Sequence, residues 1–126
     1  MPANLVDVPV LQPVEVLAKF GDDLQTWQAV EATFLAETTR LLGELHQAVR
    51  SQRWDAVLRI AHNLRGAASS LGAERVNWVA EAIERVGKVR QQESAAGLIG
   101  QLSFELDMYD RAVQSLMATL TSGAPP

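Results

Sequence analysis

The segment from Ala61 to Gly72 carries the residue types best suited to chemistry. His62 offers an imidazole, which is largely neutral near pH 7 and therefore presents a nucleophilic ring nitrogen. Arg59 and Arg65 stand three residues before and after it, and a guanidinium binds phosphate oxygens bidentately. Gly66 has no side chain to obstruct an approaching group. An exposed helical histidine is by itself more often merely solvated than functional, so the pattern around His62 decides how it is interpreted.

The segment is predicted to be helical, and this places His62 on an outer face. Apolar residues recur at spacings of three and four, at Trp54, Val57, Leu58, Ala61, Leu64, Ala68 and Leu71. Such spacing is typical of a helix with one buried stripe. His62 lies off that stripe and shares its face with Gly66 and Ser69. Because glycine inside a helix costs about 1 kcal/mol relative to alanine, Gly66 indicates that space is needed beside the ring.

The order Ala61-His62-Asn63-Leu64-Arg65-Gly66, followed by Gly72, resembles the signature of histidine-containing phosphotransfer (HPt) domains. The similarity extends from about Phe34 to Leu120, over which the helix lengths and turns fit the family. The resemblance implies that Nε2 of His62 takes the phosphoryl group and that Gly66 provides clearance. It also places Arg65 where the family more often has lysine, which keeps the charge and changes the hydrogen-bonding geometry.

The residues around His62 are expected to support the phosphoryl group or the docking of a partner. Asn63 and Ser69 are expected to lie on the docking surface. The resemblance further implies a polar residue of the following helix near Nδ1 of His62. Glu81 and Glu84 are the candidates, and Glu84 falls where several family members carry glutamine.

Positive charge is concentrated around the candidate acceptor. Between residues 51 and 72 the chain has Arg53, Arg59 and Arg65 against Asp55, although its net charge is −4. A positive face on an acidic protein steers an acidic partner toward it. The resemblance implies that this partner is a receiver domain, whose phosphorylatable aspartate lies in an acidic metal-binding pocket. The alternative is that these arginines simply solvate an exposed helix face.

Composition excludes several other kinds of site. The chain has no cysteine, which rules out disulfides and thiolate metal sites, and its two histidines are too few to indicate a zinc site. Its negative charge gives no electrostatic case for binding nucleic acid. No glycine-rich nucleotide loop or kinase catalytic loop is present. We therefore expect a phosphoryl carrier and not an enzyme, without a metal or cofactor of its own; Mg²⁺ is expected in the partner receiver domain.

The chain has no feature typical of a membrane or secreted protein. No apolar run approaches the roughly 20 residues that span a bilayer, and the N-terminus lacks the pattern of a signal peptide. We expect a cytoplasmic protein without a membrane partner. The start at Met1 without kinase sequence favours a stand-alone carrier, with an excised module of a larger kinase as the alternative. A carrier whose active face must stay free is expected to be a monomer.

Amphipathic segments joined by short turns predict an all-α protein. Helices are expected over residues 13–20 and 24–50, and a third from Ser51 as its N-cap to Gly72 as its closing glycine. A fourth helix is expected from residue 73 or 74 to 90. The last is expected to run from Ser94 as its N-cap to residue 120. Four long helices favour an antiparallel up-down-up-down four-helix bundle, with the short first helix packed across one end. Residues 1–12 are expected to form an N-terminal arm, 13–120 the bundle domain and 121–126 a flexible tail.

Two further expectations concern the core. The apolar stripe of the second helix is Trp27, Val30, Phe34, Leu41, Leu45 and Val49. The aromatic residues expected in the core or at its edge are Trp27, Trp54, Trp78 and Tyr109.

The resemblance implies a phosphorelay intermediate. It would accept a phosphoryl group on His62 from the receiver-domain aspartate of a hybrid sensor kinase and pass it to a response-regulator aspartate. One alternative is a bundle that docks on a kinase or regulator and inhibits it without being phosphorylated. Another is a phosphatase that drains a regulator through a phosphohistidine. The intact set of His62, Arg65 and Gly66 argues against a pure docking protein, and no carboxylate–amide pair beside the histidine supports a phosphatase.

Overall fold

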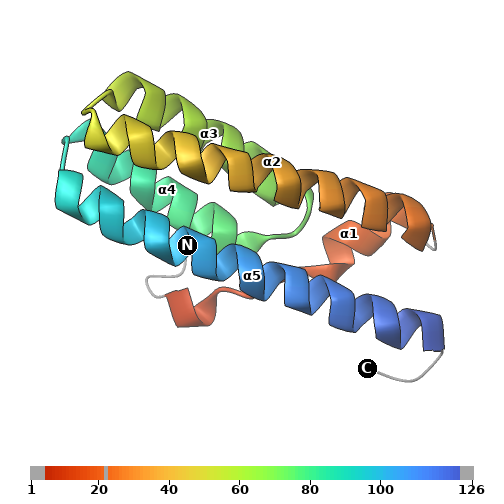
Figure 1. The fold of residues 1–126 in the computed structure, drawn as a ribbon. Helices are drawn as coiled ribbons and strands as arrows, with labels where there is room; N and C mark the ends of the chain where they lie inside the picture. The colour runs from red at the N-terminus through yellow and green to blue at the C-terminus, as the bar shows by residue number, and fades with distance from the viewer. Residues whose placement is uncertain (1–4, 22, 123–126) are drawn as a thin grey trace.

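Four long helices lie side by side in the computed structural model, which describes residues 5–21 and 23–122 (Figure 1). The elements in chain order are a short 3₁₀ turn η1 (Leu5–Asp7), α1 (Pro13–Phe20), α2 (Leu24–Arg50), α3 (Trp54–Ser70), α4 (Glu74–Lys88) and α5 (Gln92–Ser122). No strand occurs among the described residues. The predicted all-α, antiparallel four-helix bundle with an additional short N-terminal helix is confirmed.

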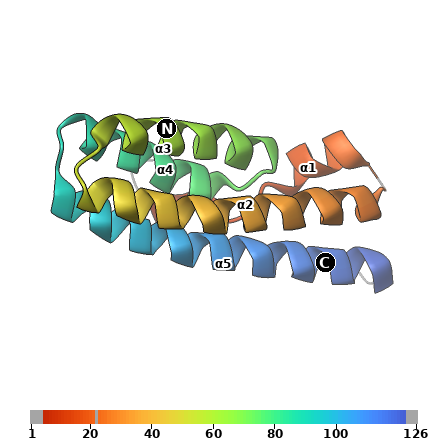
Figure 2. The ribbon, with the colours of Figure 1, turned by 45° about the horizontal axis from the view of Figure 1, so that its top comes forward.

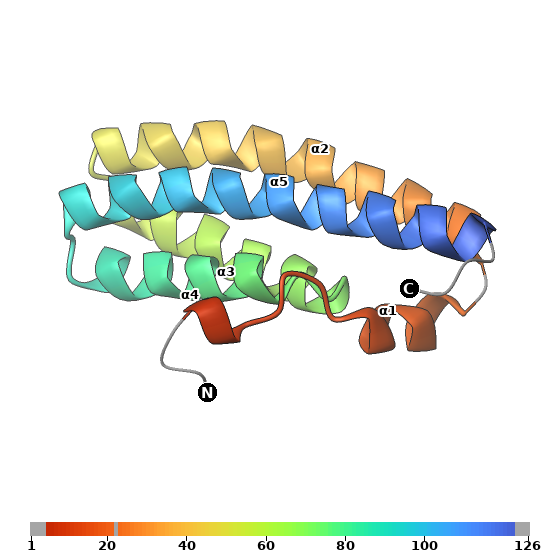
Figure 3. The same cartoon turned by 90° about the horizontal axis from the view of Figure 1, so that it is seen from below.

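The order of the helices around the bundle decides which faces are free. α3 contacts α2 and α4, and α5 also contacts α2 and α4, so that α3 and α5 occupy diagonal corners (Figure 2). α2 and α5 are much longer than α3 and α4, and α1 lies beside their projecting ends (Figure 3). A molecule that docks on the outer face of one of these helices therefore need not cover the helix diagonally opposite.

The three turns between the long helices have one common geometry. Each contains a residue in the left-handed region: Gln52 (φ 56°), Gly72 (φ 68°) and Arg90 (φ 56°). The residue that follows donates its N–H to the carbonyl five residues back, in the pairs Arg53–Ala48 (2.8 Å), Ala73–Ala68 (2.9 Å) and Gln91–Val86 (3.0 Å). This is the Schellman motif. The donating residue also stands directly before the next helix, so each connection takes three residues.

These compact turns correct several predicted boundaries. Ser51 was expected to be the N-cap of α3, but it is the C-cap residue of α2, and Arg53 precedes α3 without a side-chain cap. Ser94 lies inside α5, because the preceding turn leads directly into Gln92. α4 ends at Lys88 and not at residue 90, where the backbone is already left-handed. α5 continues to Ser122, so the expected tail from 121 begins within the helix; residues 123–126 lie outside the described part.

Gly72 closes α3 as predicted, and the structure adds a second reason for glycine there. Its φ of 68° is unfavourable for other residues, and an added Cβ would lie 2.7 Å from the carbonyl oxygen of Gln12. The N–H of Gln12 donates to the carbonyl of Gly72 at 2.8 Å, and Nε of Arg75 donates to the carbonyl of Val8 at 2.7 Å. The segment before α1 is thus fastened across the α3–α4 turn.

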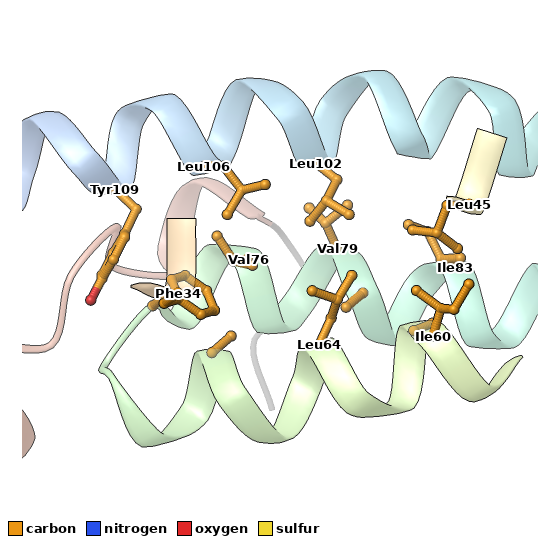
Figure 4. Packing of buried hydrophobic residues seen from close by; sticks show 14 of the residues in the cluster. Phe34, Leu45, Ile60, Leu64, Val76, Val79, Ile83, Leu102, Leu106 and Tyr109 are labelled. Atoms are coloured by element: carbon orange, nitrogen blue, oxygen red, sulfur yellow. The ribbon is translucent and has the colours of Figure 1, made fainter. Parts of the chain in front are cut away.

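A continuous apolar core runs along the bundle (Figure 4). Its members from the four long helices include Phe34, Leu45, Leu64, Ile83, Leu102 and Tyr109. The ring of Tyr109 meets that of Phe34 edge-on, with centroids 5.8 Å apart, and its hydroxyl donates to the carbonyl of Leu71 at 2.8 Å. Trp27, Trp54 and Tyr109 are buried and Trp78 is half-buried, as expected for residues of the core and its edge.

Two carboxylates lie inside the bundle, which the sequence patterns did not predict. Glu31 on α2 and Glu105 on α5 are each 2% exposed. Glu105 is 3.8 Å from the guanidinium of Arg75, whereas Glu31 faces another acid, Asp110. Burial, together with the hydrogen bond and negative charge of Asp110, raises the pKa of Glu31 to about 7. Glu31 therefore makes the fold sensitive to pH.

Glu31→Gln is expected to stabilise the fold by roughly 2 to 3 kcal/mol at pH 8 and to change it little at pH 4. The pKa of Glu31 rises from 4.5 to about 7 on folding, so the folded state retains the proton within that window. The free energy of unfolding consequently falls as the pH rises from about 4.5 to about 7, and the uncharged amide of glutamine avoids this loss. Urea unfolding at both pH values measures the effect. Glu44→Gln, an exposed site on the same helix, is the control; equal gains at pH 4 and pH 8 for Glu31→Gln would contradict the prediction.

Candidate functional site

His62 stands near the middle of α3 and points away from the bundle. Its neighbours Ala61 and Leu64 are buried, which fixes the rotation of the helix about its axis. The side chain of His62 is 77% exposed as a result. The structure thus places the imidazole on the outer face, as the apolar spacing predicted.

One carboxylate, that of Glu84 on α4, connects the imidazole to Arg65. Its Oε1 lies 3.3 Å from Nδ1 of His62, and its Oε2 accepts a hydrogen bond from Arg65 at 3.2 Å. The Glu84 side chain is only 12% exposed, so it is held between α3 and α4. Of the two carboxylates proposed as neighbours of Nδ1, the structure brings Glu84 there, whereas Glu81 pairs with Arg85 at 3.8 Å.

The position of Glu84 favours one tautomer of His62. Its Oε1 is buried and accepts no hydrogen bond among the described residues, and the contact with Nδ1 is outside hydrogen-bond geometry in this conformation. A small rotation of the ring would let an Nδ1 proton point at that oxygen. A proton on Nδ1 leaves the lone pair on Nε2, the other ring nitrogen. In that arrangement Nε2 would carry the free lone pair.

The space beside the ring is open. Gly66 is exposed one turn after His62, and a Cβ built on it would meet nothing within 4 Å. No packing contact within the described chain thus requires glycine at this position. The clearance is on the solvent side, where a second molecule would approach His62.

The other residues predicted to support the phosphoryl group or the docking of a partner lie at different places around the His62 imidazole. Arg65 lies next to Glu84, and its buried Nε has no hydrogen-bond partner among the described residues. Arg59 and Asn63 are exposed and line a groove beside α3. Ser69 is exposed two turns after His62 and does not line that groove.

The groove beside His62 was not predicted from the sequence. It has a volume of about 610 Å³ and is bounded by α1, α2 and α3. Its apolar lining consists of Phe20, Val30, Phe34, Leu41, Leu64, Ala67 and Leu71. Val30 was expected to be buried in the core but is 37% exposed on this lining. Val30 lies on the surface of α2 that faces this groove, together with residues of α1 and α3.

The described residues bring no three His, Asp or Glu side chains together in an arrangement that could hold a metal ion. Within residues 5–21 and 23–122, none of the helices combines the length and the apolar character required to cross a bilayer. The groups of this site that could take part in chemistry are the exposed imidazole of His62, the carboxylate of Glu84 and the guanidinium of Arg65.

Comparisons with known proteins agree with this geometry. A family model described as "Hpt domain" matches residues 30–120. Among solved structures, the crystal structure of histidine-containing phosphotransfer protein B (HptB) from Pseudomonas aeruginosa PAO1 is similar, with a TM-score of 0.77 and 20% sequence identity. The similarity covers 85% of this chain and 93% of that one. A comparison with curated protein sequences gives no match. The structural likeness concerns the fold, and the family match includes the segment around His62.

Proposed function

The chain belongs to the Hpt domain family, and from this premise we propose that it carries a phosphoryl group on His62 between two receiver domains of a phosphorelay. The donor would be the phosphorylated aspartate of a hybrid sensor kinase and the acceptor the aspartate of a response regulator. The observation that carries the proposal is the exposed imidazole with Nδ1 3.3 Å from Glu84 and open space above Gly66.

The transfer step follows from this arrangement. The lone pair of Nε2 attacks the phosphorus of the aspartyl phosphate, the P–O bond to the aspartate breaks, and the carboxylate departs with the bonding electrons. The ring retains its Nδ1 proton and becomes cationic, facing the carboxylate of Glu84. Arg65 contacts the same carboxylate as His62, and its guanidinium would help neutralise the phosphoryl oxygens if it turned toward them. Passing the group to the second receiver reverses these events.

The partner would supply what the chain does not. In phosphoryl transfer, catalysis is largely positioning and charge stabilisation, and the receiver's acidic pocket would contribute Mg²⁺. We propose no metal or cofactor for this chain and no nucleic-acid or membrane partner. The transfer of the phosphoryl group between the receiver domains would take place in the cytoplasm. The groove of about 610 Å³ beside His62, with Arg59 and Asn63 on its edge, supports docking of a receiver at this face.

Transfer of radiolabelled phosphate tests the proposal. A panel of receiver domains is labelled with radioactive acetyl phosphate, freed of excess reagent and mixed with the full chain. We expect label on the chain that is stable to alkali, labile to acid, and located on the peptide containing His62. Binding of a receiver without transfer from any of them would instead support the docking protein. Rapid release of inorganic phosphate with catalytic turnover would support the phosphatase.

Glu84→Gln is expected to retain phosphorylation of His62, with a transfer rate within about tenfold of the wild type. The amide oxygen can still accept from Nδ1, and the change removes a negative charge near the incoming phosphoryl group. The matched control is Glu81→Gln on the same helix, which pairs with Arg85 and not with His62. Complete loss of transfer in Glu84→Gln alone would show that the carboxylate charge is essential.

A further inference from the structure

The outward face of α5 carries a large apolar side chain in solvent. Phe104 is 58% exposed, although the opposite face of the same helix buries Leu102, Leu106 and Tyr109. At 100° per residue, Phe104 points directly away from that buried face. A single exposed apolar residue is common on protein surfaces and is by itself no indication of a partner. Its surroundings on α5 make it informative.

Gly100 lies one turn before Phe104 on the outward face. It is in the interior of a 31-residue helix, where glycine is less favourable than alanine. A Cβ at this position would meet nothing within 4 Å, so no contact within the described chain requires the glycine. The helix therefore has a hollow at Gly100 and a projecting ring at Phe104, separated by one turn.

The charged residues on the outward face of α5 would also pair with those of a second copy of the same face. Glu93 and Arg111 are both exposed there, nine residues before and nine residues after Leu102. If two copies of α5 lie antiparallel and cross at the level of Leu102, Glu93 of each faces Arg111 of the other. The same register places Phe104 of each copy over Gly100 of the other. A two-fold symmetric interface requires such pairwise exchange of positions.

We propose that this chain forms a symmetric dimer through the outward face of α5, with Phe104 seated on Gly100 of the second copy and Glu93 paired with its Arg111. Arg111 also contacts Asp107 of its own helix through Nε, at 3.1 Å. That contact uses one of the five guanidinium donors and leaves others to face Glu93. The interface is small, so the dimer is weak and forms at high protein concentration.

The dimer keeps both phosphoacceptor faces accessible. α5 is diagonally opposite α3, as Figure 2 shows, so a copy docked on α5 does not cover His62. A monomer was expected because the active face must stay free, and the α5 interface satisfies that condition. The proposal is independent of phosphotransfer, because none of its residues belongs to the His62 site.

Sedimentation velocity of the full chain, at concentrations up to about 1 mM, tests the dimer. We expect concentration-dependent dimerisation of the wild type and at least about tenfold weaker association of Phe104→Ser. Gly100→Gln should weaken association similarly while its melting temperature stays equal or rises, because glutamine is the better helix former. This combination separates a lost contact from a damaged fold.

Charge exchange tests the register. Glu93→Arg and Arg111→Glu should each weaken self-association about two- to fivefold, since each sets like charges opposite one another. The double variant should recover the wild-type affinity, and a mixture of the two single variants should form a heterodimer in preference to either homodimer. A wild type that stays monomeric at 1 mM would overturn the proposal. A dimer that is indifferent to Phe104→Ser and to the charge exchange would overturn it equally, because its interface would lie elsewhere.

Discussion

His62→Gln should accept no phosphoryl group from a receiver domain that labels the wild-type chain. The expected loss is at least about 1,000-fold, equivalent to about 4 kcal/mol of transition-state stabilisation, because glutamine has no nucleophilic ring nitrogen. The side chain is 77% exposed and does not belong to the core, so the fold should be unaffected. Transfer of radiolabel from the phosphorylated receiver measures the effect, and circular dichroism verifies the helix content.

His46→Gln is the matched control, since His46 is the other histidine of the chain and is exposed on α2. It should be labelled like the wild type. His62→Gln should still bind the receiver, because the groove and the arginines beside it are unchanged. Alkali-stable label on His62→Gln would move the acceptor to another residue and contradict the proposed site.

The orientation of His62 could be predicted because it depends on local periodicity. The buried positions Ala61 and Leu64 determine the rotation of α3, and the rotation determines which residues face solvent. The end of α3 could be predicted for a related reason, since Gly72 marks a left-handed turn. Gln52 and Arg90 adopt nearly the same conformation without being glycine, so the corresponding turns left no clear signal and the neighbouring boundaries were misplaced.

Contacts between helices were less predictable. Both Glu81 and Glu84 were candidates for the neighbour of Nδ1, and the choice between them depends on how α4 is rotated and shifted against α3. The acidic pair of Glu31 and Asp110 brings together residues from α2 and α5 that are far apart in the sequence. The groove depends on where α1 lies relative to α2 and α3. Each of these features is set by tertiary packing, for which a single helical pattern contains no information.

The clearance assigned to Gly66 leads to the second large effect. Gly66→Gln should lower the rate of phosphoryl transfer by about 100-fold, because a side chain one turn from His62 would displace the approaching receiver from its reactive position. The fold should be unchanged or stabilised by up to about 1 kcal/mol, since an added Cβ meets nothing within 4 Å and glutamine favours the helix. Transfer kinetics and thermal unfolding of the same variant measure both effects.

Gly97→Gln separates the steric effect from the change in helix propensity. Gly97 is also exposed within a helix, and a Cβ there likewise meets nothing within 4 Å, but it lies on α5, diagonal to the helix of His62. It should show a similar stability change without loss of transfer. Gly66→Ala should fall between wild type and Gly66→Gln, because obstruction increases with side-chain size. Wild-type transfer by Gly66→Gln would show that the space is not used, and the glycine would then have no explanation in either folding or phosphotransfer.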